Sequence, residues 1–451
     1  MDLPPASDTG GDAGTKPTAP SAQGSVTARL RSPALRRLRW PVGVYLISRV
    51  VYLVIAVIDV HIRTSVAKPA HLWHALRQWD GVWYVRLAAH GYPHKLPPPH
   101  IPIDTHFSTL GFEPLYSILM WLGAHAVTHL DPSNGYPYEK VGLIIALACG
   151  GVATVLMGRL AERWWGPRAG RLSVLFICLF PGSIVFSMVY SEGLMLMLVA
   201  GCLLALEDRR WLLAGVLAGF ATAIEPPALA IVPACAVVAV LELRREGWAA
   251  WRAILAPLLA PAGAVAVGIY LWSWVGTPFA TYIAQRRAWG EGGTPFLGLF
   301  KAVKTFAHEI RIFRNFHHTP LDMNLPVGVL GACVLVFALY VMWHMRGGAA
   351  DRVVSAPFGG VLDRVIGTVG EGVGTGVSIG AWVWTAGVAY LSLSSAQTPP
   401  NPRLLLCAFP ATLALVVGQR SKRALWIVLG ITAVLMVAMS IDTFVGNGLR
   451  P

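Results

Sequence analysis

The sequence predicts an all-α polytopic membrane protein with about eleven transmembrane helices. Of its 451 residues, 55% are apolar and only 13% are charged, and the mean hydropathy is +0.57. Soluble globular domains carry about twice that share of charged residues. The apolar residues fall in repeated runs long enough to cross a bilayer, separated by short charged or Pro/Gly-rich breaks. A single membrane domain, residues 29–451, therefore accounts for nearly the whole chain.

The chain begins with a segment, residues 1–28, that is rich in Ser, Thr, Pro, Gly and Ala and lacks the apolar core of a signal peptide. We expect a disordered cytoplasmic tail there, held inside by the arginines that follow it. Transmembrane helices are then expected at residues 41–60, 141–160, 172–189, 193–206, 211–224, 227–241, 254–275, 325–344, 377–393, 404–417 and 424–444. Residues 112–130 would make a twelfth span if they crossed.

The basic residues indicate which connections face the cytoplasm. If residues 112–130 do not fully cross, five short connections on one side carry 15 Lys and Arg, whereas the short connections on the other side carry 1. Because short cytoplasmic loops are enriched in basic residues, we expect residues 112–130 to be re-entrant or interfacial. Two long loops, residues 61–140 and 276–324, then lie on the outer face of a plasma membrane. This bias also explains the net charge of +13, so no nucleic-acid partner is expected.

Neither a metal ion nor another cofactor is expected. All six cysteines fall within apolar runs and lack CxxC spacing. Residues 61–106 of the first outer loop hold seven histidines, but Gly-Tyr-Pro between His90 and His94 prevents one helix face from presenting both. The chain also contains no Asp-x-Asp, the acid pair that binds metal in nucleotide-sugar transferases. A metal site formed by the loop histidines is the alternative.

An acid stands among aromatic residues in WDGVWYVRLAAHGYP, residues 79–93. On a helical interpretation of residues 72–87, Asp80 lies on the same face as an apolar stripe of Leu and Trp side chains. A carboxylate beside apolar surface is unfavourable unless it is paired or used. Two interpretations follow. Asp80 either caps a helix or pairs with Arg77 or Arg86, or it is the general base of an active site at the membrane.

Other charged residues are predicted at the outer ends of spans. Glu113, Glu192 and Glu225 are each either acids of a first helical turn or residues of the same site. Arg403 opens a span after QTPPNPR. It is either an interfacial anchor or a clamp for a phosphate group, to which a guanidinium offers paired donors.

Five motifs occur in order along the chain. They are the WD, WY and GY elements within residues 79–92, GFEPLYS at 111–117, YSEG at 190–193, AQRRAWG at 284–290 and PRLLLCAFP at 402–410. Together they resemble a family within the GT-C membrane glycosyltransferases: the mannosyltransferase that adds the second mannose in glycosylphosphatidylinositol synthesis, with its bacterial relatives. The chain departs from that family's pattern at Glu113, Glu225 and Leu404, where the family has an aromatic residue, Arg and Tyr. Donor or acceptor recognition is therefore expected to differ from the eukaryotic enzyme.

The resemblance implies a GT-C-like bundle and an inverting transferase. The expected donor is polyprenyl-phosphate mannose, and the expected acceptor is a lipid-linked or cell-envelope glycan on the outer face. Asp80 would be the base and Arg403 the phosphate clamp, with Arg286 or Arg287 as a second clamp. The residues expected to bind substrate are Trp79, Trp83, Tyr84, Glu113, Tyr190, Glu192, Glu225 and Trp289. The alternative is a transporter or flippase of lipid-linked saccharides, which would place ionisable groups or broken helices near the bilayer midplane.

Overall fold

The structure is a computed structural model that describes residues 33–66, 72–99, 107–130, 137–291, 324–346, 374–395, 400–419 and 421–445, with a few positions between 296 and 308. Every regular element in these ranges is an α-helix or a short 3-10 helix, so the predicted all-α class is confirmed. The chain divides into two units, Met1–Trp40 and Pro41–Pro451, and the description below concerns the second. The predicted tail, residues 1–28, lies outside the described residues.

Five described segments are long and apolar enough to cross a membrane. They lie in α2 (Pro33–Val66), α6 (Tyr138–Trp165), the run Pro226–Val275, α15 (Asn324–His344) and α21 (Lys422–Val445). A bent pair, α7 (Pro167–Leu179) and η3 (Pro181–Ser187), makes a sixth. The other predicted spans are shorter helices: α8 (Glu192–Glu207), α9 (Trp211–Ala221), α18 (Ile379–Ser394) and α20 (Phe409–Val417).

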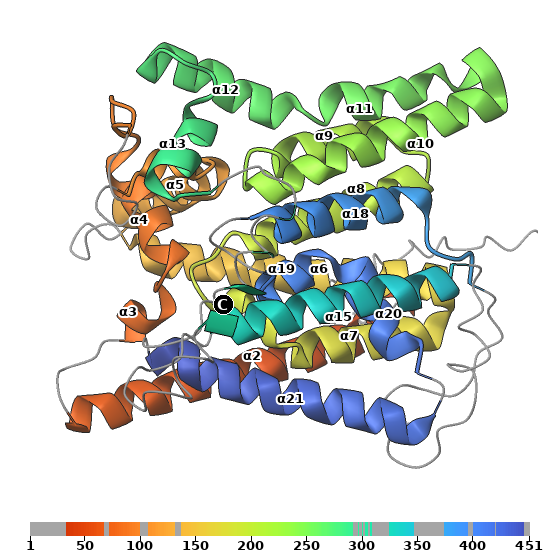
Figure 1. Cartoon of the computed structure of the whole chain (residues 1–451), viewed down its shortest axis with the longest axis horizontal. Coiled ribbons are helices and arrows are strands. Elements are labelled where there is room, and N and C mark those ends of the chain that lie inside the picture. The colour runs from red at the N-terminus through yellow and green to blue at the C-terminus, as the bar shows by residue number, and fades with distance from the viewer. Residues whose placement is uncertain are drawn as a thin grey trace, which may run out of the picture. The chain divides into compact units, whose positions relative to one another are not determined.

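The run Pro226–Val275 crosses twice rather than once. It begins with η4 (Pro226–Ala230) and α10 (Ile231–Glu246), and then turns at η5 (Gly247–Ile254). The chain returns as α11 (Leu255–Leu259) and α12 (Ala262–Val275), which pack on α9 (Figure 1). The run therefore corresponds to two predicted spans, 227–241 and 254–275.

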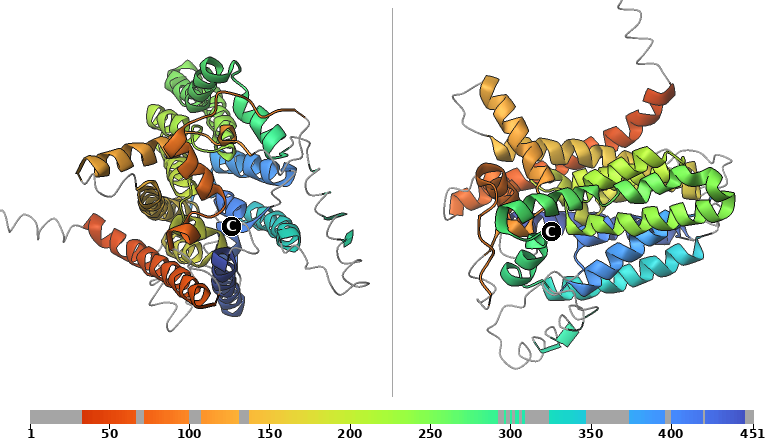
Figure 2. Two further views of the ribbon diagram at one scale, coloured as in Figure 1. Left: turned by 90° about the vertical axis from the view of Figure 1, so that its left-hand side faces the viewer. Right: turned by 90° about the horizontal axis from the view of Figure 1, so that it is seen from above.

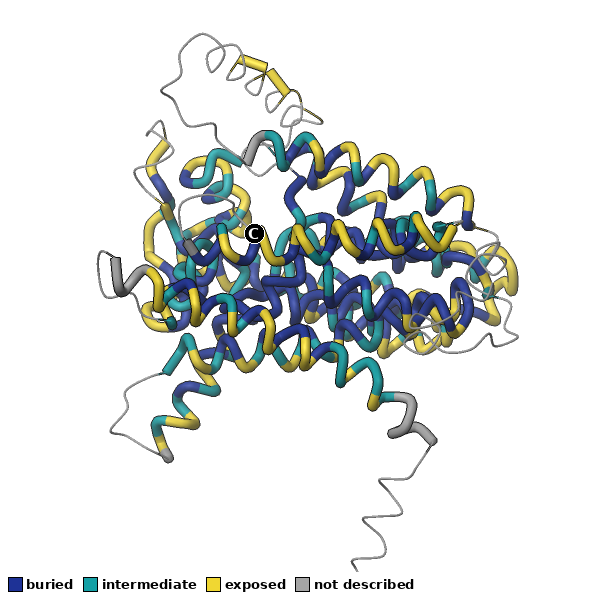
Figure 3. Tube along the Cα trace, turned by 90° about the horizontal axis from the view of Figure 1, so that it is seen from below, coloured by how far each residue is buried: buried dark blue, intermediate teal, exposed yellow. Residues whose placement is uncertain are grey.

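Buried residues concentrate in the interior helices. α6 packs against α7 and α8, and half of its membrane-spanning window is buried, against 28% for α2 and for α21. The long helices lie side by side when viewed end-on (Figure 2). The outer helices carry exposed apolar side chains, such as Ile47 and Val434 at 68% each (Figure 3). An apolar outer face is what a helix presents to lipid.

The first outer loop does not form the single helix predicted for residues 72–87. It forms α3 (Leu72–Leu76) and α4 (Asp80–His90), and Trp79 between them has a φ of 57°. Positive φ is unusual for a bulky side chain and marks a sharp change of chain direction. The predicted apolar stripe is therefore split, and Asp80 is the first residue of α4. Further along, α5 (Leu115–Leu130) has 16 residues, short of the roughly 20 needed to cross a bilayer.

The predicted span 172–189 is bent by 75° where α7 meets η3. Phe180 has extended φ and ψ at this point. The cause is Pro181, because a proline ring disfavours helical geometry in the residue before it. The segment that follows η3 is buried, with Tyr190 at 1% exposure and Ser191 at 0%, and leads directly into α8.

The two predicted outer loops contact each other. α13 (Ala280–Ala288) packs against η1 (Thr109–Gly111). Gln285 Nε2 donates to the Gly111 carbonyl at 2.6 Å, and Trp289 Nε1 donates to the Ser108 carbonyl at 3.1 Å. Both loops lie at the end of the bundle that carries α3 and α4 (Figure 1).

Candidate active site

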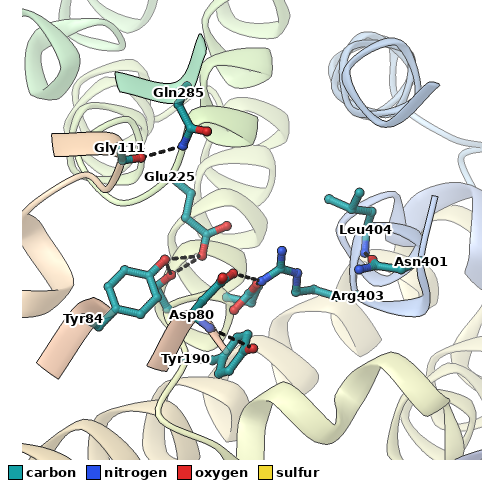
Figure 4. Close-up of polar contacts among 11 residues, drawn as sticks. Asp80, Tyr84, Gly111, Tyr190, Glu225, Gln285, Asn401, Arg403 and Leu404 are labelled. Atoms are coloured by element: carbon teal, nitrogen blue, oxygen red, sulfur yellow. Dashed lines mark hydrogen bonds and ion pairs between the residues drawn. The ribbon is translucent and has the colours of Figure 1, made fainter. Parts of the chain in front are cut away.

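A short helix, α19 (Pro402–Cys407), presents Arg403 to the interior. Asn401 caps this helix, since its Oδ1 accepts a hydrogen bond from the Leu404 N–H at 2.9 Å (Figure 4). Pro402 occupies the first helical position, where its missing N–H is not needed. The sequence NPR thus begins a helix whose first turn holds the arginine.

Arg403 is paired with two carboxylates from different parts of the chain. Its Nη1 donates to Asp80 Oδ2 at the start of α4, and the same nitrogen lies 3.2 Å from Glu192 Oε1 at the start of α8 (Figure 4). The side chains of Arg403, Asp80 and Glu192 are 18%, 27% and 1% exposed. The guanidinium also lies 5.6 Å from the ring centre of Tyr190. This group is partly removed from solvent, so its charges interact more strongly than a surface pair would.

The structure gives Asp80 a different partner from the two arginines considered in the sequence. Arg77 pairs with Glu139 at 2.5 Å, and Arg86 lies over the Trp83 ring at 4.7 Å. The interpretation that Asp80 pairs with Arg77 or Arg86 is therefore wrong. Its partner is Arg403, 323 positions away in the chain.

A second acidic group lies next to the first. Ser191 Oγ donates to Glu225 Oε1, and the Tyr84 hydroxyl lies 2.6 Å from Ser191 Oγ and 3.4 Å from the same carboxylate oxygen. Burial raises the pKa of Glu225 to about 7, although the nearby Arg403 lowers it. Burial, and then the Glu225 charge, also hold the pKa of Tyr84 well above its usual range. Near neutral pH, Glu225 therefore exchanges a proton easily.

The group contains three carboxylates and one guanidinium. Glu192 Oε2 is buried and has no hydrogen-bond partner among the described residues. Arg403 Nε is also buried and also lacks a partner among them. Buried polar atoms are almost always satisfied in folded proteins, so unsatisfied atoms in a charged cluster suggest a ligand site.

An aromatic cluster lies beside these acids. The Trp83 ring is 5.1 Å from Trp289, 5.7 Å from Phe107 and 6.4 Å from Phe112, measured between ring centres. Tyr84, one residue further along α4, stacks edge-on against Phe112 at 5.1 Å. The cluster joins α4 to the segment around η1 and to the end of α13, and thereby holds both outer loops at the site.

Three predicted site residues, Glu113, Arg286 and Arg287, have no recorded contact with Arg403 or with the carboxylates of Asp80, Glu192 and Glu225. Glu113 lies in the turn before α5, and burial raises its pKa to about 7. Arg286 and Arg287 are exposed on α13, with Arg286 5.8 Å from the Tyr282 ring and Arg287 donating to the Pro97 carbonyl at 3.2 Å. Their predicted roles as substrate ligand and second clamp therefore stay predictions.

All five motifs identified in the sequence contribute to this end of the bundle. Asp80 of the motif at 79–92 and Glu192 of YSEG pair with Arg403 of PRLLLCAFP. GFEPLYS and AQRRAWG contact each other through the hydrogen bond from Gln285 to Gly111. Trp79 directly precedes Asp80 and its side chain is partly buried. The sequence interpretation missed Ser191 as a site residue, although it lies within YSEG beside two predicted ones.

A cavity of about 870 Å³ lies between α4, α5, α9 and α12. Its lining is apolar and includes Ala88, Trp121, Phe220, Ala266 and Tyr270. Ser117 also lines it, and the Ser117 hydroxyl donates to the Tyr84 carbonyl at 3.0 Å. The cavity thus borders the helix that carries Asp80 and Tyr84.

Metal binding finds no support among the residues that the structure describes. Within those ranges, no group of three or more His, Cys, Asp or Glu side chains is arranged to hold a metal ion.

Comparison with known proteins finds a likeness to solved structures. No protein-family model and no curated protein matches the sequence. Among solved structures, the chain is similar to the apo-form crystal structure of the Archaeoglobus fulgidus oligosaccharyltransferase. The TM-score is 0.44, and the sequence identity is 14% over 89% of this chain and 56% of that one. The chain therefore spans little more than half the length of that protein, and the side chains around Arg403 carry the functional conclusion.

Proposed function

We propose that this protein is an inverting membrane glycosyltransferase that moves mannose from polyprenyl-phosphate mannose to a lipid-linked or cell-envelope glycan on the outer face of the plasma membrane. One observation carries the proposal: an acid suited to act as a base, Asp80, lies directly against an arginine suited to hold phosphate, Arg403. A transferase of this kind needs a base and a phosphate-binding group close to the anomeric carbon of the donor sugar.

The proposed reaction begins when the donor phosphate binds Arg403. A phosphate offers the guanidinium paired acceptors, so it competes with Asp80 for Nη1 and frees that carboxylate. The acceptor hydroxyl then attacks the anomeric carbon from the face opposite the phosphate. Its proton passes to Asp80, the bond from the anomeric carbon to the phosphate oxygen breaks, and the electron pair stays on the phosphate beside Arg403. The configuration at the anomeric carbon is inverted.

The remaining acids suit the binding of a sugar. Carboxylates accept hydrogen bonds from hydroxyl groups, and Glu192 Oε2 has no partner among the described residues. Glu225, with its pKa near 7, is largely protonated in mildly acidic solution, which lessens repulsion of an incoming phosphate. The aromatic cluster around Trp83 and Trp289 offers flat apolar faces for the sugar ring.

The apolar cavity supports a lipid-linked substrate. At about 870 Å³ it is large enough for many methylene or isoprene carbons, and its lining is almost entirely apolar. Because Ser117 and Ala88 bring it up against α4, a lipid chain lying there would hold its head group close to Asp80.

The test is a transfer assay with purified protein in vesicles, using radiolabelled polyprenyl-phosphate mannose and an extract of membrane lipids as acceptors. We expect label to move into a glycan product with inverted linkage, and polyprenyl-phosphate glucose to be a poorer donor. Absence of transfer from every polyprenyl-phosphate sugar tested would refute the proposal.

A transporter of lipid-linked saccharides is the second candidate, favoured by the 75° bend between α7 and η3 and by the buried Glu192. Broken helices and buried acids are common in transporters. The acids of the candidate site, however, stand at the ends of helices: Asp80 and Glu192 are the first residues of α4 and α8. Movement of a fluorescent lipid-linked saccharide across vesicles, without glycosyl transfer, would favour the transporter.

A further inference from the structure

α2 carries a charged residue in the middle of a predicted span. Arg49 is 3% exposed and lies in a window with a mean hydropathy of 2.1. A charge inside a membrane segment is unfavourable unless its polar atoms are satisfied, so such residues generally have a defined partner. No ion pair joins Arg49 to a carboxylate anywhere in the described ranges, and its recorded partners are neutral.

The guanidinium of Arg49 is fully occupied. Nη1 donates to the Ser183 carbonyl at 2.5 Å and to Ser187 Oγ at 3.3 Å. Nη2 donates to Ser183 Oγ at 3.1 Å and to Ser48 Oγ at 3.2 Å, and Nε donates to Ser48 Oγ at 3.2 Å. A guanidinium has five N–H groups, and these contacts number five. No donor is left for an anionic substrate, so Arg49 serves the protein's own backbone and hydroxyls.

The element that Arg49 grips is η3, directly after the 75° bend. A broken helix leaves carbonyl groups without their usual N–H partners. The Tyr52 hydroxyl donates to the Phe180 carbonyl at 3.1 Å, and Arg49 donates to the Ser183 carbonyl. The rings of Tyr52 and Tyr45 lie 4.4 Å and 5.0 Å from the guanidinium carbon. α2 therefore adds hydrogen-bond donors at the bend, where the Phe180 carbonyl also accepts from the Ser183 N–H at 2.9 Å.

η3 in turn contacts the candidate active site on two sides. A Cβ added at Gly182 would lie 2.1 Å from the Pro402 carbonyl oxygen and 3.0 Å from the Arg403 nitrogen, so η3 packs directly against the first turn of α19. In the other direction the chain runs from Ser187 to Tyr190, whose hydroxyl accepts a hydrogen bond from the Asp80 N–H at 3.3 Å. Small movements of η3 would therefore displace both Arg403 and the segment that leads to Glu192.

We infer that Arg49 is a positioning residue: it holds η3 so that Arg403 and Glu192 meet Asp80 in the geometry needed for donor binding. It touches none of these three side chains. The inference rests on the proposed function only for its activity readout, because the placement of η3 can be measured independently of any reaction.

The test compares Arg49→Met and Arg49→Lys with Arg209→Met. Arg209 serves as a control because it holds Glu242 and Glu246 at 2.6 Å and 2.7 Å, and its recorded ion pairs do not involve η3. Hydrogen exchange in lipid nanodiscs should speed up at least about tenfold in residues 181–192 and 401–407 of Arg49→Met, and stay at the wild-type rate in α12. Arg49→Lys should recover part of the protection, since an ammonium has three donors instead of five. The control should leave both segments unchanged.

Activity gives the second readout. Measured per folded molecule, Arg49→Met should raise the donor KM at least about tenfold, whereas a merely structural role lowers the folded fraction and leaves KM unchanged. If Arg49→Met does not fold, Gly182→Ala tests the same link, because its Cβ pushes η3 away from Pro402. Wild-type exchange in both segments of the foldable variants would overturn the inference. Lack of transfer by the wild-type protein would overturn the proposed function. The hydrogen-exchange result would still show whether Arg49 holds η3 in place.

Discussion

Asp80 Oδ2 accepts a hydrogen bond from Arg403 Nη1, which ties the first residue of α4 to the first turn of α19. The pair joins the proposed base to the proposed phosphate clamp before any substrate is present. Donor binding and activation of the acceptor are therefore linked through one guanidinium.

Replacing Asp80 with Asn should lower transfer by about two to four orders of magnitude, because an amide cannot take the acceptor's proton. Arg403 keeps Glu192 as a partner, so the fold should lose no more than about 2 kcal/mol. Turnover and melting temperature are measured on one preparation. Asp208→Asn is the matched control, since Asp208 also pairs with an arginine, Arg163, at 2.8 Å. Substantial turnover in Asp80→Asn would contradict the assignment of Asp80 as the general base.

Replacing Arg403 with Ala should harm the fold as well as the activity. It leaves Asp80 and Glu192 without their counter-charge, and breaking such a partly buried pair costs about 3–5 kcal/mol. Arg403→Lys keeps the charge but loses the planar fork, so it should fold and yet raise the donor KM about tenfold or more. Donor titrations and thermal melts of both variants check this. Normal donor kinetics in the lysine variant would reduce Arg403 to a structural partner of the two acids.

Glu113→Gln should remove a pH dependence of stability. Burial raises the pKa of Glu113 from 4.5 to about 7, so between these values the folded protein holds a proton that the unfolded chain has released. Ionisation of Glu113 should therefore cost the wild-type protein about 3 kcal/mol of stability as the pH rises from about 4.5 to about 7, whereas Glu225, whose pKa is also near 7, contributes to the pH dependence of both proteins. A glutamine side chain is neutral at every pH, so the melting temperature of the Glu113→Gln protein should vary less with pH. Parallel slopes for both proteins across pH 5–8 would contradict this.

The predicted orientation can be checked by labelling single cysteines with an impermeant reagent in intact cells. The six native cysteines are first replaced. Cysteine at the exposed position Arg286 should be labelled from outside, and cysteine at the exposed positions Arg245 and Arg423 should be protected until the cells are opened. The opposite pattern would place the candidate site on the cytoplasmic face.

The helical class could be predicted from composition and periodicity, because bilayer-spanning helices need only local hydrogen bonds and an apolar surface. The end of the bundle that holds the site could also be predicted, since Asp80 and Arg403 both lay in loops on the side poor in basic residues. Their pairing could not be predicted, because no local rule relates positions 323 residues apart. The break at Trp79 was missed because a positive φ on tryptophan has no sequence signal.

The role of Arg49 shows a different limit. Its charge within an apolar run stood out in the sequence, but its partners are serine hydroxyls and a carbonyl made available by a bend at Phe180. The proline that causes the bend was visible, whereas the matching of five guanidinium N–H groups to four acceptor oxygens depends on tertiary packing.

The excess of acids around Arg403 bears on how the site could be inhibited. Above its pKa, near 7, Glu225 gains a negative charge beside Arg403, and the site becomes more attractive to cations. A sugar mimic with an amidine in its ring stays positively charged over this range and resembles the electron-poor carbon of a transferring sugar. Its inhibition constant should fall as the pH rises from 6 to 8, and Glu225→Gln should abolish that trend. The same surplus of charge that weakens phosphate binding would thus make the site selective for cationic sugar analogues.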